Sequence, residues 1–152
     1  MKPSACPVIE VTDGAGALVR EDWLLRAEPV HRQLRPALPE DYAGCLREVF
    51  AHGGRMAIAA ADDRVTAVMV WRVLVNTAYR RAIYVDDLVT DAANRSSGAG
   101  KSLLDWSADK AAAMGCHWLT LDSGTHRTDA HRFYFRERMH VSSFHFVKRI
   151  GT

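Results

Sequence analysis

The chain has 152 residues and a formal net charge of +2, and 48% of its residues are hydrophobic and 25% are charged. This length predicts one domain, residues 1–152, which buries enough surface to fold without a metal or a disulfide. The small net charge, without any run of like charges, gives no reason to expect a nucleic acid or a membrane surface as a partner.

The cysteine pattern and the hydropathy of the chain indicate the cellular compartment in which we expect the protein. Cys6, Cys45 and Cys116 lie far apart and form no CxxC pair, which favours reduced thiols. Residues 1–11 contain no apolar stretch as long as a secretory signal requires, and no segment approaches the roughly 20 apolar residues of a membrane span. We therefore expect a soluble, cytoplasmic protein.

The N-terminal third predicts one short strand and two helices. Residues 8–11 are a strand candidate that ends in the turn-forming residues 13–16. Apolar residues at steps of three and four from residue 19 to residue 34 indicate one face of a helix. A second helix is expected over residues 39–50, because a proline and two acids open it and Gly53-Gly54 follow it.

The middle of the chain changes to strand patterns. Two apolar runs, residues 56–61 and 64–75, meet at Asp62-Asp63 and predict a β-hairpin. Residues 81–90 form the next strand candidate. We interpret the arginines between Arg72 and Arg81 as part of a solvated loop.

The C-terminal part alternates between helix and strand patterns. Residues 100–114 and 129–139 are predicted helices, and residues 117–122 and 142–150 are predicted strands. The order β-α-α-β-β-β-α-β-α-β indicates an α/β (α+β) fold with a mixed, mostly antiparallel central sheet flanked by helices. Its unit from Ile83 to Asp122 is expected to be a right-handed parallel crossover.

A glycine-rich segment joins the strand that ends at Thr90 to the helix that follows. A phosphate fits such a place because the first N–H groups of a helix lack internal partners and the helix dipole favours negative charge. Gly98 and Gly100 would allow close approach to the main chain, and Arg95 and Lys101 would add positive charge. The plain alternative is a helix entry that merely uses convenient turn residues.

The same segment ends in Gly100-Lys101-Ser102, as a P-loop does. A P-loop also needs a glycine at the position of Arg95, and it normally follows the first strand of a parallel sheet, whereas here a hairpin precedes it. We therefore set the nucleotide-hydrolase interpretation aside.

The spacing R-x-x-G-x-G over residues 95–100 resembles the acyl-CoA pyrophosphate loop of the GNAT superfamily of N-acetyltransferases. Residues 83–90 look like the family's central strand, particularly in its polyamine-acetylating branch, and residues 129–146 resemble its A-x-x-Phe-Tyr segment. The resemblance, which extends from about residue 65 to residue 150, implies a GNAT fold. It also implies an enzyme that transfers an acetyl group from acetyl-CoA to a primary amine by direct attack.

The resemblance implies the cofactor-binding residues as well. The main chain of Leu88 and Val89 is expected to pair with the pantetheine arm like an added strand. The pyrophosphate loop would comprise Arg95, Ser96, Ser97, Gly98, Ala99, Gly100, Lys101 and Ser102.

Three residues are expected to carry the chemistry. Tyr134 lines up with the family's tyrosine, which can protonate the departing sulfur; the alternative is a core aromatic residue. Asp86 matches the proposed base of the polyamine branch, and Asp87 is expected to bind the substrate, so a cationic small-molecule amine is the favoured acceptor. Adjacent strand residues should point to opposite faces, and buried carboxylates need partners. The alternative for this pair is salt-bridged acids at a sheet bulge.

The chain departs from the family pattern near Tyr134. Arg127 stands where the family often has asparagine, Arg138 replaces a glycine in a left-handed turn, and Met139 replaces an aromatic residue. These departures keep open a non-catalytic acyl-CoA-binding module, used as a sensor or for docking a partner. A protein lysine or N-terminus also remains a possible acceptor. We expect no metal, because the histidines lack metal-ligand spacing, and an exposed last strand would favour a homodimer.

Overall fold

The computed structural model describes residues 6–151. The chain divides into two compact units, Met1–Thr120 and Leu121–Thr152, which we describe separately. The expectation about a signal sequence falls partly on residues 1–5, which lie outside the described residues. None of the described helices has the length and apolar character needed to cross a membrane.

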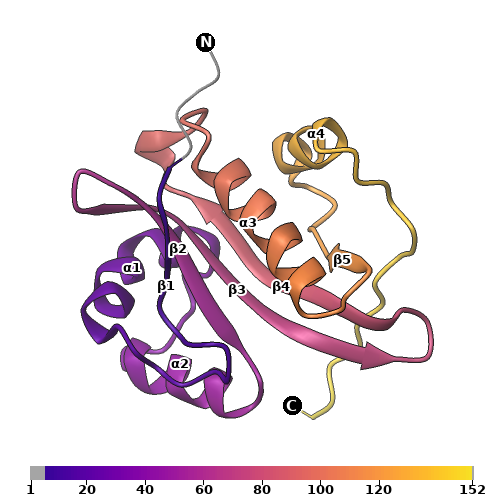
Figure 1. Ribbon diagram of the computed structural model, residues 1–152, viewed down its shortest axis with the longest axis horizontal. Coiled ribbons are helices and arrows are strands. Elements are labelled where there is room, and N and C mark those ends of the chain that lie inside the picture. Colours follow the sequence, from indigo (N-terminus) through magenta and orange to yellow (C-terminus); the bar gives the residue numbers. More distant parts are fainter. Residues whose placement is uncertain (1–5, 152) are drawn as a thin grey trace. The chain divides into compact units, whose positions relative to one another are not determined.

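The strands form one five-stranded sheet with the order β1-β2-β3-β4-β5 (Figure 1). Each pair of neighbouring strands from β1 to β4 is antiparallel. The turn between β2 and β3 is built by Asp62 and Asp63, with φ of 48° and 60°, the backbone conformation that closes a tight hairpin. This confirms the predicted hairpin. The strands are β1 Val8–Glu10, β2 Arg55–Ala61, β3 Arg64–Asn76, β4 Arg80–Thr90 and β5 Trp118–Leu121.

Helices cover both faces of the sheet in the first unit (Figure 1). On one face lie α1, Glu21–Leu34, and α2, Tyr42–Ala51, and on the other lies α3, Ala99–Ala113. The first helix begins two residues later than the apolar period suggests, and the side chain of Val19 is exposed. Asp41 caps α2 by accepting a hydrogen bond from the Gly44 N–H at 2.9 Å.

The two faces of the sheet hold separate groups of buried side chains. Between the sheet and α3, Trp71 packs edge-on against Trp106, with ring centroids 5.8 Å apart. The face toward α1 and α2 has a hydrophobic centre, which holds in place the helices that carry polar residues to the site described below. Its buried members include Leu24, Ala27, Val30, Tyr42, Leu46, Phe50, Met56, Ile58, Val68 and Val70.

The second unit contains α4, Thr128–Arg136, followed by an extended segment. The predicted strand over residues 142–150 is wrong, because no strand is assigned there and every one of these side chains is exposed. Phe144 and Phe146 alternate as strand residues do, and they are 81% and 90% exposed. Alternation supplies strand propensity, but a strand forms only when its main chain pairs with another strand.

Candidate functional site

A β-bulge in β4 determines how the two adjacent acids are presented. Val70 of β3 pairs with Asp87 and the next residue, Trp71, pairs with Val85, so Asp86 is an extra residue in β4. An extra residue shifts the alternation of side chains by one position. The prediction that the two acids point to opposite faces is therefore wrong, and both line the same cavity.

The cavity lies on the α1 and α2 side of the sheet and has a volume of about 190 Å³. One wall is apolar and the other is charged, which is the usual composition of a small-molecule site. Leu38, Cys45, Leu46, Val49 and Val70 form the apolar wall, and His31, Arg72, Asp86 and Asp87 form the charged wall.

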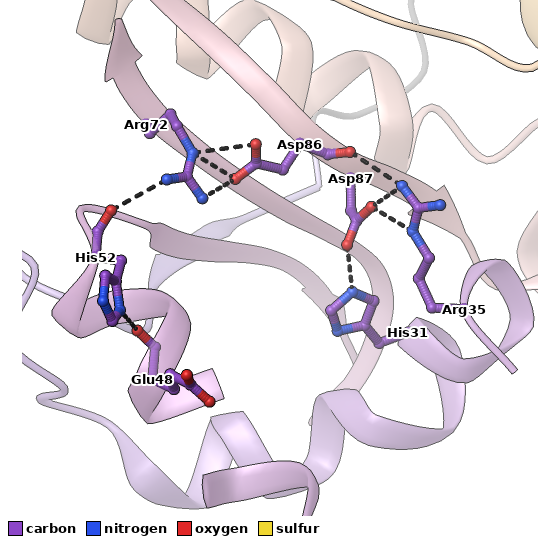
Figure 2. Close-up of polar contacts among 7 residues, drawn as sticks. All are labelled: His31, Arg35, Glu48, His52, Arg72, Asp86 and Asp87. Atoms are coloured by element: carbon purple, nitrogen blue, oxygen red, sulfur yellow. Dashed lines mark hydrogen bonds and ion pairs between the residues drawn. The ribbon is translucent and has the colours of Figure 1, made fainter. Parts of the chain in front are cut away.

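Asp86 is held by Arg72 of β3 in a forked ion pair (Figure 2). The Arg72 Nε donates to Oδ1 and Oδ2 at 3.1 and 2.9 Å, and Nη2 donates to Oδ2 at 2.7 Å. The Nη1 group donates to the His52 carbonyl at 3.1 Å, just beyond the end of α2. The hydrogen bond to Asp86 raises the pKa of Arg72. The assignment of Arg72 to a solvated loop is thus wrong, since its long strand carries it into the site.

Asp87 is held by two residues of α1 and its end (Figure 2). His31 Nε2 lies 2.8 Å from Oδ2, and the Arg35 Nε donates to Oδ1 at 2.7 Å. Burial works to raise the pKa of Asp87, but the hydrogen bonds and charges of His31 and Arg35 outweigh it, so the pKa lies below its usual range. Asp87 therefore keeps its negative charge at neutral pH.

His31 connects Asp87 to a buried tyrosine. Its side chain is 2% exposed, and Nδ1 lies 3.0 Å from the Tyr42 hydroxyl. Burial raises the pKa of Tyr42, so that hydroxyl stays protonated. Sequence reasoning missed both residues. The available signal was a histidine that shares the buried face of α1 with Leu24, Ala27 and Val30, because a polar side chain on such a face needs a partner.

The ion pairs of Asp87 predict a loss of stability in acid. A carboxyl whose folded pKa is lowered stabilises the protein above its unfolded pKa, near 3.9, and this stabilisation is lost as the pH falls through the folded pKa. At pH 7, Asp87→Asn should lower the free energy of unfolding by about 3 kcal/mol, since it leaves His31 and Arg35 without their charged partner. Urea unfolding at pH 7 and near pH 3 measures this, and the difference between variant and wild type should shrink in acid. A difference independent of pH would contradict the assignment.

The glycine-rich segment forms the start of α3, as predicted. Gly98 precedes the helix with φ of +86°, and the first helical hydrogen bond runs from the Ser102 N–H to the Gly98 carbonyl at 2.9 Å. The N–H groups of Ala99, Gly100 and Lys101 therefore begin the helix without acceptors inside it. An anion could bind there through the main chain.

Two side chains of this segment have other contacts. The Lys101 Nζ lies 2.9 Å from Asp105 Oδ1, and the Ser102 hydroxyl accepts a hydrogen bond from the Cys6 N–H at 3.0 Å. Arg95, at the start of the glycine-rich segment, is exposed, and Ser96 has a positive φ of 64°. Lys101 thus pairs with Asp105 along the exposed surface of α3.

Leu88 and Val89 lie in the later half of β4. They pair with Met69 and Val68 of β3. On the other side of β4, the Thr120 hydroxyl of β5 donates to the Ile83 carbonyl at 3.4 Å, near the beginning of β4. The four residues of β5 are fewer than the 11 of β4, so β5 can pair with only part of that edge.

Tyr134 belongs to the second unit, on α4, and is half-buried there. Burial raises the pKa of Tyr134, and the positive charge of Arg127 partly offsets this. Arg138 adopts the left-handed conformation with φ of 64°, and the Met139 N–H donates to the Tyr134 carbonyl at 3.0 Å. The turn that a glycine makes in the family pattern is therefore present here with arginine, at some cost in backbone strain.

The structure brings Asp86 and Asp87 together in the first unit, which also carries the glycine-rich segment, and it places Tyr134 in the second. Among residues 6–151, no three His, Cys, Asp or Glu side chains gather as a metal ion would require.

Comparison with known proteins connects this geometry to one family. A sequence model described as "Acetyltransferase (GNAT) family" matches residues 18–140. The uncharacterized N-acetyltransferase YhdJ of Bacillus subtilis (strain 168) is 50% identical over 52 residues, which are 34% of this chain and 37% of that protein. The aminoalkylphosphonate N-acetyltransferase of Salmonella typhimurium (strain LT2) is 35% identical over 66 residues, 43% of each protein. The chain thus spans less than half the length of either relative.

A solved structure resembles the chain over nearly its whole length. Its subject is AAC(6')-Iy in complex with a bisubstrate analog, CoA-S-monomethyl-acetylneamine, and it superposes with a TM-score of 0.80. It covers 98% of this chain and 100% of its own, at 15% sequence identity. This likeness concerns the fold, and it confirms the predicted fold class.

Proposed function

The chain belongs to the GNAT acetyltransferase family, and on that premise we propose that it transfers the acetyl group of acetyl-CoA to a primary amine of a cationic small molecule. The observation that carries the proposal is the cavity at the β4 bulge, where two carboxylates face an apolar wall. Two proteins support an amine acceptor: one relative is an aminoalkylphosphonate N-acetyltransferase, and the protein of similar fold, AAC(6')-Iy, binds an acetylneamine conjugate of CoA. The free cysteines Cys6, Cys45 and Cys116 suit a cytoplasmic setting.

The residues at the start of α3 fit acetyl-CoA. The N–H groups of Ala99, Gly100 and Lys101, at the positive end of the helix dipole, would hold the pyrophosphate, with Arg95 at the rim. The main chain of Leu88 and Val89 would pair with the pantetheine arm. When bound, acetyl-CoA supplies the activated acetyl group as a thioester.

The remaining roles are to position the amine and to transfer protons. The amine must lose its proton, the two reactants must be held in line, and the thiolate must be protonated as it leaves. Asp87, whose pKa is lowered, would hold the ammonium group through its permanent charge. Asp86 would accept the proton of the amine, directly or through a water, and Tyr134 would donate a proton to the departing sulfur. No residue of the chain becomes acetylated in this scheme.

The ion pairs of the acids are also what the alternative of structural acids at a bulge predicts. Two facts support a catalytic role for the acids in addition to this structural role. Both carboxylates line a cavity, and the side chain of Asp86 is 24% exposed, so a substrate can reach it. Release of CoA with some amine in a panel distinguishes the enzyme from a non-catalytic acyl-CoA module.

Thermal unfolding with acetyl-CoA tests the cofactor part of the proposal. A ligand at 100 times its dissociation constant stabilises the fold by about 2.7 kcal/mol, which raises Tm by several degrees at this size. We expect this rise with acetyl-CoA and none with ATP–Mg²⁺. A rise in Tm with ATP–Mg²⁺ alone would restore the P-loop interpretation. No rise with either ligand would contradict the binding of acetyl-CoA.

Two glycine variants make the test specific to the loop. Gly98→Ala forces an alanine into a left-handed conformation at the anion site, so it should lower Tm and also diminish the rise with acetyl-CoA. Gly115→Ala is the matched control, because Gly115 has φ of +68° at the other end of α3 and an added Cβ would meet nothing within 4 Å. It should lower Tm but keep the full rise with acetyl-CoA.

A further inference from the structure

His31 is the most deeply buried of the charged or polar side chains that line the cavity at the β4 bulge. Its side chain is 2% exposed, against 13% for Asp87 and 24% for Asp86. Both of its ring nitrogens have a polar partner, since Nε2 lies 2.8 Å from Asp87 Oδ2 and Nδ1 lies 3.0 Å from the Tyr42 hydroxyl. What these partners donate and accept therefore determines which nitrogen carries the proton.

The Tyr42 hydroxyl decides the tautomer of His31. Burial raises the pKa of Tyr42, so this hydroxyl carries its proton at neutral pH. Within residues 6–151, His31 Nδ1 is its one hydrogen-bond partner, and a buried O–H donates to the acceptor it has. Nδ1 thus accepts from Tyr42, and the proton of the neutral imidazole is on Nε2, which donates to Asp87 Oδ2. A doubly protonated His31 would leave the Tyr42 O–H without an acceptor.

The two oxygens of Asp87 are occupied unequally. Arg35, at the end of α1, places Nε 2.7 Å and Nη2 2.6 Å from Oδ1. An ionised carboxylate has about four acceptor positions, two on each oxygen, so Arg35 fills those of Oδ1. His31 uses one position of Oδ2 and leaves the other open. The oxygen that His31 holds is therefore the one with which Asp87 can bind a further donor.

We propose that His31 and Tyr42 are the positioning residues of the amine site: His31 holds Asp87 Oδ2 toward the ammonium group of the acceptor, and Tyr42 holds His31 in the tautomer that donates. His31 does not take the proton of the amine in this arrangement, because Nε2 already carries a proton and Nδ1 accepts from Tyr42. This inference rests on the proposed acetyl transfer. It assigns the place of the ammonium group to α1 and α2 as well as to β4.

NMR of the wild-type protein tests the tautomer directly. Long-range ¹H–¹⁵N spectra of protein labelled at histidine show which ring nitrogen carries a proton, and His31→Gln identifies the signals of His31 by their loss. At pH 8 and without acetyl-CoA, we expect a single proton on Nε2 of His31. A proton on Nδ1, or on both nitrogens, would overturn the inference.

The same signals report the binding of an amine without turnover. An ammonium group at Asp87 Oδ2 shares this oxygen with the Nε2–H of His31, so butylamine or 1,4-diaminobutane at constant pH should shift the Nε2 signal until the site is saturated. Butan-1-ol has the same length as butylamine and no charge, and it should not shift the signal. The exposed His117 does not line the cavity and is the internal reference. An Nε2 signal that neither amine moves contradicts the proposed position of the ammonium group.

Two variants of His31 separate positioning from proton transfer. His31→Gln keeps an N–H that can donate to Asp87 but cannot take up a proton, and His31→Leu lacks both properties. With the fastest amine of a panel, we expect kcat/KM to stay within about threefold of wild type in His31→Gln and to fall at least about tenfold in His31→Leu, chiefly through KM. A similar loss of kcat in both variants would make His31 a proton acceptor and overturn the inference.

Two controls belong to these variants. The rise in Tm with acetyl-CoA, which depends on the start of α3, shows that each variant is folded. His117→Gln makes the same replacement at an exposed histidine and should leave kcat and KM unchanged.

A double-mutant cycle tests whether Tyr42 acts through His31. Tyr42→Phe removes only the hydroxyl and should raise KM for the amine in the wild-type background. In His31→Leu it should have no further effect on KM, because the residue through which it acts is gone. An equal change of KM in both backgrounds would show that the hydroxyl has a separate, merely structural role, and would overturn the assignment of Tyr42.

Failure of this inference and failure of the proposed function give different results. If CoA is released with an amine that does not move the His31 signals, acetyl transfer stands and the positioning role is overturned. If an amine moves these signals but no amine of the panel releases CoA, the ammonium site is supported and acetyl transfer fails.

Discussion

Replacement of Asp86 by asparagine is expected to lower kcat at neutral pH by about 10²- to 10⁴-fold, the range that a positioned proton acceptor contributes. The amine is protonated at this pH, and direct attack on the thioester requires its free base. Asparagine keeps the volume of the side chain and an oxygen that can accept from Arg72, so the fold should survive. The deficit therefore reports the lost proton acceptor.

The pH dependence of Asp86→Asn distinguishes a base from a residue that only positions the substrate. An amine with a pKa near ~10.4 gains its free base about tenfold per pH unit below that value, so the activity of the variant should rise steeply between pH 7 and pH 10. Initial rates of CoA release over this range, with the best acceptor, measure the effect. Asp63→Asn in the exposed hairpin is the control and should behave as the wild type does.

The comparison with Asp87 sharpens this result. Asp87 is 13% exposed and its pKa is lowered, so it is a weak base and a permanent charge. Asp87→Asn should therefore raise KM for the amine more than it lowers kcat. An Asp86→Asn enzyme with wild-type kcat at pH 7 would show that the acid has only the structural role of a paired residue at a bulge.

The sequence predicts most elements of the fold because each leaves a local signal. The hairpin is marked by Asp62-Asp63, whose side chains tolerate the left-handed backbone of a tight turn. The start of α3 is marked by glycines, of which Gly98 needs a positive φ. These signals depend on residues that are neighbours in the chain, and a single sequence contains them.

The sequence suggests a bulge with ion-paired acids at Asp86 and Asp87 only as an alternative, because no local signal fixes the bulge or the partners of the two acids. The bulge arises from the register between β3 and β4, which strand periodicity cannot give, and it changes which face receives Asp86. Arg72 lies 14 residues from Asp86 in the chain, and His31 lies 56 residues from Asp87. Their pairing depends on how the sheet and α1 pack, so the sequence pattern alone places Arg72 in solvent and gives His31 no role.

The last predicted strand failed for a related reason. Residues 142–150 alternate like a strand, and Phe144 and Phe146 satisfy the pattern. Pairing decides whether such a segment becomes a strand, and no strand is assigned to these residues in the described chain. The homodimer, in which a second copy of the chain would bind this segment, stays a prediction from the sequence.

Replacement of Tyr134 by phenylalanine is expected to lower kcat by about 10²-fold or more, since general acids contribute at least that much. An acid must carry its proton at the working pH, and burial raises the pKa of Tyr134, so the hydroxyl is protonated throughout the neutral range. Phenylalanine keeps the ring and its contact with Phe133, whose centroid lies 5.5 Å away. Single-turnover acetyl transfer to the best amine measures the effect apart from binding.

A change at Arg127 tests the same role independently, because it alters the pKa of the Tyr134 hydroxyl. The positive charge of Arg127 works to lower the pKa of Tyr134, so Arg127→Gln should raise that pKa further. If Tyr134 is the acid, the alkaline limb of the wild-type rate, where the hydroxyl ionises, should shift to higher pH in Arg127→Gln and disappear in Tyr134→Phe. Arg132→Gln, on the same helix and paired with Asp129 at an exposed position, is the matched control. A Tyr134→Phe enzyme with an unchanged rate and an unchanged alkaline limb would assign Tyr134 to packing alone, and the departing sulfur would then take its proton from water.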